Sequence, residues 1–336
     1  MYPFPKMIEW LKKMFGKFGL IFALLFIFAL FAVIAPESFS SRRSIETMTR
    51  QMAITGVAAL GMTLIIILGG IDLSIGSVVA LTTVIIAIVL RGFTGDGHSA
   101  EMYDIQVGSG AVVIALIFGG GAAAIVGFLN GVLITRLRVV PFIVTLGMLL
   151  IVRGVAKGLA HEQKVDAPTS LLNSLLAPND GFMSHGVIVM LVLAILVSIL
   201  LTYTRLGRQI YAIGSNELTA RLCGVMVERT KLIVYTLASF SVGIAGTLQF
   251  SRLTVGDPTV AGGLELDVIA AVVIGGGSLS GGEGSVLGTM VGVAIITVIR
   301  TGCSHMGLPN WVQEIITGCI IVSAVAIDRI RHRRAA

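Results

Sequence analysis

Long apolar runs alternate with short polar connections along the whole chain. Each run is close to the ~20 residues that a helix needs to cross the hydrocarbon layer of a bilayer. About ten such segments can be drawn from the pattern, and the eighth is short because it runs into glycine. They cover approximately residues 18–35, 50–70, 75–91, 110–134, 140–158, 186–203, 231–250, 264–277, 284–300 and 311–328. The pattern therefore predicts an all-α integral membrane protein with about ten transmembrane helices.

Composition supports this class and excludes others. Of the 336 residues, 55% are hydrophobic and only 12% are charged, against about a quarter charged in an ordinary soluble domain. Soluble, disordered, collagen-like and disulfide-scaffold classes are excluded. No polar connection is long enough for a folded soluble domain, so residues 1–336 are expected to form a single transmembrane domain.

Charge sets the expected orientation. The chain has 24 Lys and Arg against 18 Asp and Glu, a net charge of +6. The basic residues lie at the ends of apolar runs, which is typical of loops on the cytoplasmic side of a membrane and not of a nucleic-acid-binding surface. With ten spans, both termini are expected in the cytoplasm. The basic residues on that side are Lys6, Lys12, Lys13, Lys17, Arg136, Arg138, Arg205, Arg208, Arg221, Arg229, Lys231, Arg329, Arg331, Arg333 and Arg334.

A weak internal repeat divides the chain. Gly127 and Gly131 are spaced as Gly288 and Gly292 are, each pair follows a glycine cluster, and each is expected to pack helices together. The two segments are the fourth and ninth spans, which run in opposite directions. This predicts an inverted repeat of five plus five helices, with halves at residues 18–158 and 186–328. The alternative is a chance similarity between two helices with small residues.

Gly69-Gly70-Ile71-Asp72-Leu73-Ser74-Ile75-Gly76-Ser77 separates the second and third segments. Glycines allow the helix to break, and Asp72 or Ser74 can cap the helix that follows. An acid beside apolar spans is also a candidate for lining or gating a translocation pathway, so Asp72 and the neighbouring Ser74 are candidates for that role. Both interpretations stay open.

Other polar residues within or beside the spans are candidates for the same pathway. Asn130 lies inside the fourth segment, where it either contacts substrate or joins helices, and Glu265 and Asp267 open the eighth. The three cysteines and five histidines show no metal or disulfide spacing. No catalytic constellation is visible, so the chain is not expected to be an enzyme.

The connection at residues 207–225 predicts a short helix outside the membrane. Ser215 or Asn216 suits the N-cap, Glu217 suits the first turn and Gly224 suits the position after the helix. A helix of about two turns is marginal alone, so we expect it to dock on something. The alternative is an interfacial helix that only connects spans.

A glycine-rich loop at residues 275–285 contains Leu-Ser-Gly-Gly-Glu, like the characteristic loop of ABC ATPase domains. The chain has no G-x-x-x-x-G-K-[ST] phosphate cradle, so it is not such an ATPase. The loop is interpreted as a flexible turn or re-entrant break at the internal face.

Taken together, these stretches resemble the membrane permease subunit of ribose-type (monosaccharide) ABC importers, the inner-membrane component of binding-protein-dependent transport systems. The matching stretches are GGIDLSIGS at 69–77, GFLNGVLI at 127–134, PFIVTLGMLLIVRG at 141–154, GRQIYAIGSNELTARLCG at 207–224, ELDVIAAVVIGGGSLSGGEGSVLGTMVG at 265–292 and WVQEIITGCI at 311–320.

The resemblance implies a bacterial inner-membrane homodimer that works with an ABC ATPase subunit inside and a periplasmic sugar-binding protein outside. No cofactor is implied for this chain, since the ATPase subunit binds ATP. The segment 214–224 then corresponds to the coupling element that inserts into the ATPase. The residues assigned to it are Gly214, Ser215, Asn216, Glu217, Ala220, Arg221 and Gly224. The sequence departs from the family at Leu218-Thr219, where an acidic or small pair is usual.

Three alternatives remain. A branched-chain amino acid ABC permease has a similar layout. An ion-coupled secondary transporter needs buried acids, and only Asp72 and Asn130 could serve. A channel lacks any visible selectivity filter. The leading hypothesis is a sugar permease that takes its energy from a partner.

Overall fold

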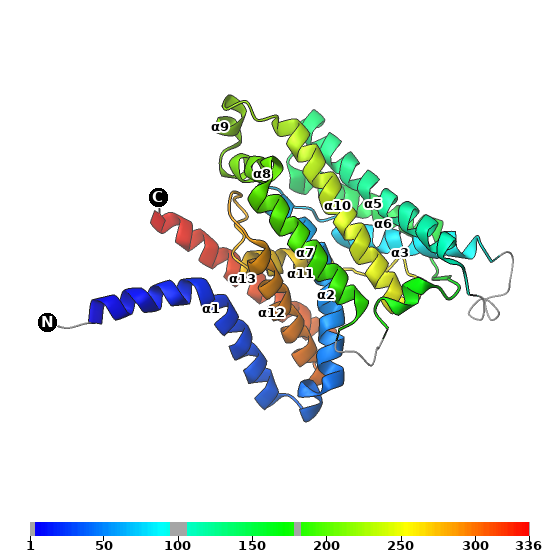
Figure 1. Cartoon of the computed structure of the whole chain (residues 1–336), viewed down its shortest axis with the longest axis horizontal. Coiled ribbons are helices and arrows are strands. Elements are labelled where there is room, and N and C mark those ends of the chain that lie inside the picture. The colour runs from blue at the N-terminus through cyan, green and yellow to red at the C-terminus, as the bar shows by residue number, and fades with distance from the viewer. Residues whose placement is uncertain (1–3, 95–105, 178–182, 336) are drawn as a thin grey trace.

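The protein is described by a computed structural model over residues 4–94, 106–177 and 183–335, without the side chains of residues 4–18, 324–325 and 327–335. Helices dominate, and they pack side by side into one bundle (Figure 1). The elements are α1 (Phe4–Ile34), η1 (Glu37–Ser40), α2 (Arg42–Ile67), α3 (Ile75–Arg91), α5 (Ser109–Leu137), α6 (Pro141–Leu159), β1 (Val165–Asp166), η2 (Leu171–Ser174), α7 (His185–Tyr203), α8 (Arg205–Ser215), α9 (Glu217–Leu222), α10 (Val227–Leu253), β2 (Val255–Gly256), α11 (Leu264–Ile274), α12 (Val286–His305) and α13 (Asn310–Ala335).

Helix α2 forms the centre of the bundle. Every residue from Ala53 to Ile67 is buried, so this helix is apolar on all faces and contacts α7, α10, α11 and α12. Helix α10 packs against it, and a Cβ atom at Gly61 would overlap the backbone of Ala238. Small residues thus bring the two helices close together, as is usual inside membranes.

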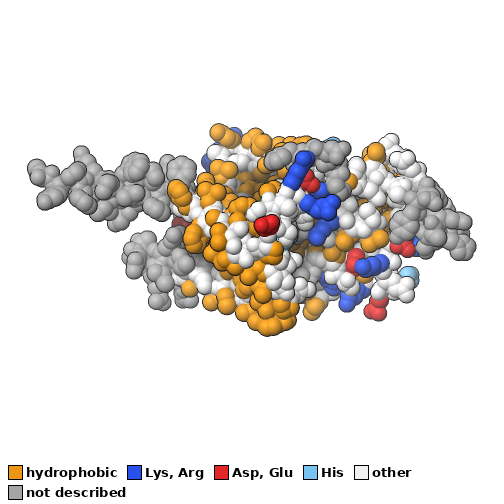
Figure 2. All heavy atoms as spheres, turned by 90° about the horizontal axis from the view of Figure 1, so that it is seen from below, with side chains coloured by type: hydrophobic (Ala, Val, Ile, Leu, Met, Phe, Trp, Pro, Cys, Tyr) orange, Lys and Arg blue, Asp and Glu red, His pale blue; other side chains and the backbone are white. Residues whose placement is uncertain are grey.

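The outer helices expose apolar side chains. In α2, 83% of the most apolar stretch is buried, but in α6 only 22% is. Ile117 of α5, Leu150 of α6 and Ile195 of α7 are each at least 60% exposed. Hydrophobic side chains also cover a broad area of the face seen in Figure 2, with charged side chains gathered toward one side. A surface of this kind is suited to lipid or to another membrane subunit.

Six described helices are long and apolar enough to cross a membrane: α2, α5, α6, α7, α10 and α12. Two shorter apolar helices are α3 and the part of α1 from Gly19 to Ile34. Each of the predicted apolar segments coincides with a helix, so the all-α membrane class is confirmed.

The eighth segment is not helical along its whole length. Helix α11 has 11 residues, which is about 16 Å of helix and about half of the hydrocarbon thickness. The expectation of a helix over residues 264–277 is wrong at its end, because the backbone turns at Gly275 and Gly276 has a positive φ of 89°. This part of the chain consists of an irregular stretch, a short helix and a glycine loop.

Two irregular segments enter the bundle from opposite ends. One is residues 68–74 between α2 and α3. The other is residues 254–263 between α10 and α11, which begins with β2 paired antiparallel to β1. The starts of α3 and α11 meet inside the bundle, where Gly76 lies against the carbonyl of Ala261 and the side chain of Glu265. We call the two ends of the molecule the α9 end and the β-ladder end.

Contacts made by α2, α3, α5 and α6 are matched by contacts made by α10, α11, α12 and α13, taken in the same order. Helix α3 packs on α10, and α11 packs on α2. Likewise α3 contacts α5 and α6, and α11 contacts α12 and α13. Helix α5 packs on α10, as α12 does on α2.

Candidate functional site

A short helix stands at the α9 end, where the sequence predicts it. The side chain of Asn216 is its N-cap and accepts a hydrogen bond from the Thr219 backbone N–H at 2.9 Å. Gly224 follows the helix with φ of +83°, a conformation that glycine adopts without strain. Helix α9 is preceded by α8, which the sequence did not predict separately and in which Ser215 is the last residue.

The charged residues of α9 are paired within the chain. Glu217 lies 3.6 Å from Arg221 on the next turn and 2.7 Å from Lys231 of α10. Arg221 also lies 2.6 Å from Glu228 of α10, and the Glu228 carboxylate is the main reason that the pKa of Arg221 is raised. Ala220 is buried. These contacts hold α9 in one orientation on the start of α10.

Backbone contacts at several glycines join α8 to the rest of the bundle. We call this place the glycine junction; it consists of Gly214, Gly281 and Gly282, together with Ile67 at the end of α2 and Gly69 just after it. The Gly282 N–H donates to the Ile67 carbonyl at 2.8 Å. A Cβ atom at Gly214 would overlap the Ile67 carbonyl, and one at Gly281 would lie 2.9 Å from Gly69 Cα. The helix before α9, the end of α2 and the loop before α12 thus meet backbone to backbone.

The hydroxyl of Tyr211, in α8, adds a hydrogen bond next to the glycine junction. It donates to the Gly284 carbonyl at 2.8 Å. The glycine loop is therefore held against the same helix that leads into α9.

Asp72 and Ser74, in the irregular segment before α3, lie together with Asn130 of α5, and all three are at most 1% exposed. One carboxylate oxygen of Asp72 accepts from the Ser74 N–H at 2.8 Å and from the Ser74 hydroxyl at 2.6 Å. The Asn130 amide donates to the Ser74 hydroxyl oxygen at 3.1 Å. Ser74 occupies the N-cap position of α3, but its side chain makes no capping hydrogen bond. The carboxylate near this end of the helix is that of Asp72.

Glu265 and Asp267 lie in the first turn of α11. Asp267 is bound by Arg300 of α12, 2.7 Å away. Glu265 accepts a hydrogen bond from the Gly263 N–H at 3.2 Å. Carboxylates are thus at the positive N-terminal ends of both α3 and α11, where the helix dipole favours them.

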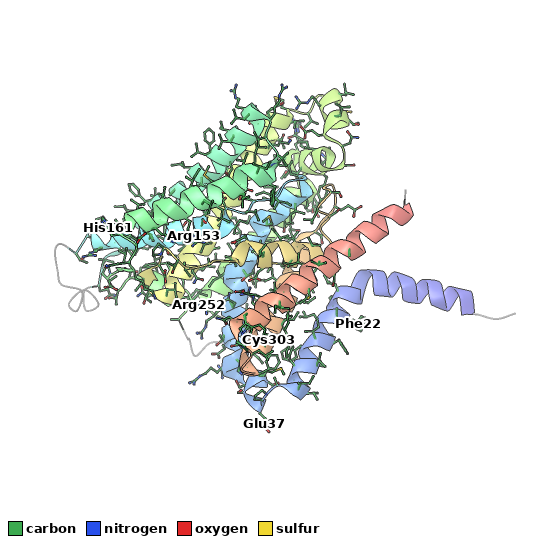
Figure 3. All side chains as sticks on the ribbon, turned by 180° about the vertical axis from the view of Figure 1, so that it is seen from behind. Phe22, Glu37, Arg153, His161, Arg252 and Cys303 are labelled. Atoms are coloured by element: carbon green, nitrogen blue, oxygen red, sulfur yellow. The ribbon has the colours of Figure 1, made fainter. Side chains whose placement is uncertain are left out.

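Two arginines were missed by the sequence analysis. Arg153 of α6 donates to the carbonyls of Pro258 at 3.1 Å and Val260 at 2.7 Å, so it holds the irregular segment before α11 (Figure 3). Arg300 binds Asp267. Both are basic residues inside apolar segments of a charge-poor chain, which was a signal that could have identified them.

The four glycines assigned to packing lie at close helix contacts. Cβ atoms at Gly127 and Gly131 would meet Tyr235 and Leu232 of α10. Cβ atoms at Gly288 and Gly292 would overlap the backbone of α11 and the glycine that ends it. Within the part of the chain that the structure describes, no group of His, Cys, Asp and Glu is placed to hold a metal ion.

The comparison with known proteins places the chain in a family. The model of the family described as branched-chain amino acid transport system / permease component matches residues 44–325. The chain is 35% identical to the ribose import permease RbsC of Bacillus subtilis over 91% of this chain and 90% of the relative. It is 34% identical to the fructose import permease FrcC of Rhizobium meliloti, over 89% and 81%.

A third relative, the galactose/methyl galactoside import permease MglC of Salmonella typhimurium, is 31% identical over 97% of both chains. No solved structure matches the chain. The resemblance seen in the motifs is confirmed, and the chain belongs to this family of importer permease components, whose named relatives import sugars.

Proposed function

We propose that this chain is the permease subunit of an ATP-driven ABC importer for a monosaccharide of the ribose type. The observation that carries the proposal is the connection of α9, by way of α8 and the glycine junction, to the irregular segment that contains Asp72. Relatives named for ribose, fructose and galactose import support the sugar class. The branched-chain amino acid alternative is supported only by the description of the family.

Asp72 and Asp267 do not favour an ion-coupled transporter. Asp72 is bound by Ser74 at the N-terminus of α3, and Asp267 is paired with Arg300. A coupling-ion site is built from buried acids or unwound backbone carbonyls that are available to the ion. Here chain groups already bind these two, so the energy source is assigned to an ABC ATPase subunit that binds ATP.

Ten spans arranged as an inverted repeat of five plus five belong to the proposal. The contacts of the two halves support this arrangement. When α2, α3, α5 and α6 are paired in order with α10, α11, α12 and α13, the contacts of one set have equivalents in the other. Helices α1 and α7 do not correspond in this way: α1 contacts α12, whereas α7 contacts α2.

The α9 end is assigned to the cytoplasm of a bacterial cell, with the chain in the inner membrane and both termini inside. Exposed arginines at this end, Arg136, Arg205, Arg208 and Arg229, support the orientation. The β-ladder end then faces the periplasm and a sugar-binding protein. A second copy of the chain completes the pathway, with residues 1–336 as one membrane domain.

The glycine junction suggests how the subunit works. ATP-driven closure of the ATPase subunits would displace α9, and α8 would carry the displacement to Ile67 and to the loop before α12. The segments before α3 and after α11 would then shift together. The residues assigned to lining or gating the path are Asp72, Ser74, Asn130, Glu265 and Asp267. One segment precedes α3 and the other follows α11, and the starts of these two short helices lie against each other, so the segments are suited to a paired movement.

Reconstitution tests the function. The chain is inserted into liposomes with its ATPase subunit and the sugar-binding protein from the same operon, and uptake of labelled ribose, fructose, galactose and leucine is measured. We expect ATP-dependent uptake of one of the sugars and none from an ion gradient without ATP. ATP-dependent leucine uptake would favour the amino acid alternative, and uptake driven by the ion gradient alone would contradict the proposal.

A further inference from the structure

Helix α9 presents an apolar ridge to the outside. Leu218 is 71% exposed and Leu222 is 82% exposed. The two leucines are four residues apart and therefore lie on one face of the helix. Met226, just after the helix, is 58% exposed. These three residues are called the leucine ridge.

The charged side chains of α9 are all paired within the chain. Glu217, Arg221, Glu228 and Lys231 form a connected set of ion pairs between α9 and α10. Their formal charges sum to zero. Exposed ion pairs contribute little stability each, but a connected set restricts the orientation of the helix. The pairs thus hold α9 so that the ridge faces away from the bundle.

We infer that the leucine ridge is the surface by which this chain grips its ATPase subunit, and that the partner offers an uncharged, apolar cleft. The inference rests on the proposed function. It assigns the grip to Leu218 and Leu222, and it assigns Glu217 and Arg221 to orienting the helix.

A protein cleft fits this surface better than a lipid surface does. Helix α9 has six residues and stands at the tip of the molecule, beyond the start of α10 (Figure 1). A helix that lies on a membrane needs a longer apolar face opposite a basic one. The ion pairs leave α9 itself with no net charge, and the exposed arginines of this end, such as Arg208 and Arg229, lie outside the helix. Two leucines at positions i and i+4 match the apolar anchors by which a helix docks in a protein groove.

Binding of the purified ATPase subunit to the permease in nanodiscs tests the ridge. The variant Leu218→Ser/Leu222→Ser is compared with Leu287→Ser, a control at an equally exposed leucine (80%) in the first turn of α12. We expect the double variant to weaken binding by about a hundredfold, which is about tenfold for each leucine, and the control to change it by less than about twofold. Equal effects of the two variants would overturn the inference.

A second variant separates the ridge from the coupling assignment. Residues Glu217–Leu222 are replaced by alternating Gly and Ser. If this replacement abolishes binding of the ATPase subunit but the double serine variant does not, the assignment of the grip to the leucine ridge is wrong, and the assignment of the coupling segment is retained. If the replacement still binds, the coupling segment itself is wrong.

A fluorescent label shows what covers the ridge. Leu222→Cys is labelled with bimane in a Cys223→Ser/Cys319→Ser background, since these two cysteines are exposed. We expect water-like emission in nanodiscs alone and a blue shift when the ATPase subunit is added. Blue-shifted emission before that addition would show that lipid covers the ridge, and would overturn the inference.

Discussion

Asp72 and Asp257 make the same pair of hydrogen bonds in the two irregular segments of the fold. Asp72 accepts from the N–H and hydroxyl of Ser74, at 2.8 and 2.6 Å. Asp257 accepts from the N–H and hydroxyl of Thr259, at 2.8 and 2.7 Å. One turn follows α2 and the other follows α10, which are equivalent helices in the proposed repeat. Each turn stiffens the chain where it leaves a long helix.

Removing the Asp72 carboxylate should destabilise the protein more than neutralising it. In Asp72→Ala the buried Ser74 N–H and hydroxyl lose their acceptor, so we expect a loss of about 1–3 kcal/mol in the free energy of unfolding. Asp72→Asn keeps an oxygen in place and should lose about half as much. Unfolding by sodium dodecyl sulfate measures both variants. An equal loss in the two would show that the charge, and not the hydrogen bonds, is what matters.

Asp257 should make stability depend on pH at the β-ladder end. Burial raises the pKa of Asp257, but the hydrogen bonds from Thr259 and the ammonium of Lys164, 3.5 Å away, outweigh burial and leave the pKa below its ordinary value. A lowered pKa in the folded state stabilises the protein above the unfolded pKa of ~3.9. This stabilisation is lost as the pH falls through the folded pKa.

The matching measurement compares the melting temperature of the native chain with that of Asp257→Asn from pH 8 to pH 3. The difference should stay constant down to about pH 5 and shrink below about pH 4. Lys164→Met is the control: it should reduce the difference without removing it, because the Thr259 hydrogen bonds remain. A difference that grows toward acid pH would contradict the assignment.

A side chain at the glycine junction should impair transport without impairing assembly. In Gly214→Ala the added Cβ meets the Ile67 carbonyl and the Gly282 backbone. We expect ATP-dependent uptake to fall by at least about tenfold, a shift of about 1.4 kcal/mol. The ATPase subunit should still bind, because the exposed face of α9 is unchanged. Gly121→Ala, where no atom lies within 4 Å, is the control and should transport normally.

The ion pair of Asp267 and Arg300 should give a measurable interaction energy in a double-mutant cycle. The side chain of Asp267 is 6% exposed and that of Arg300 is 42% exposed. Each single change, Asp267→Asn or Arg300→Gln, should cost about 2 kcal/mol, less than a fully buried pair because solvent reaches Arg300. The double variant should cost less than the sum, as measured by unfolding titrations. Additive losses would show that the pair contributes no coupling.

Local features of the sequence narrowed the start of α9 to a cap at Ser215 or Asn216 and predicted its end before Gly224. Asn216 and Gly224 act on backbone groups within a few residues, and their chemistry needs no tertiary contact. The same holds for the helix break at Asp72. The predicted limits of α3 and α6 are close to the observed ones, since periodic apolar runs define long helices well.

Other features depended on contacts that no local pattern contains. The glycine junction joins segments near residues 67, 214 and 282, which are far apart in sequence. The end of α11 was misjudged because glycine is neutral in hydropathy and Gly275–Gly277 extended an apolar run. The orientation of α9 was also unpredictable, since Glu217 and Arg221 became partners of α10 and left the leucines outside.

The glycine junction also has a consequence for building hybrid transporters. Its contacts are between backbones, so they hardly depend on which side chains surround them. Six residues of α9 could therefore be exchanged for those of another permease to recruit a foreign motor, provided that Gly214, Gly281 and Gly282 are kept. Partner choice and force transmission would then be separable properties of one short stretch of chain.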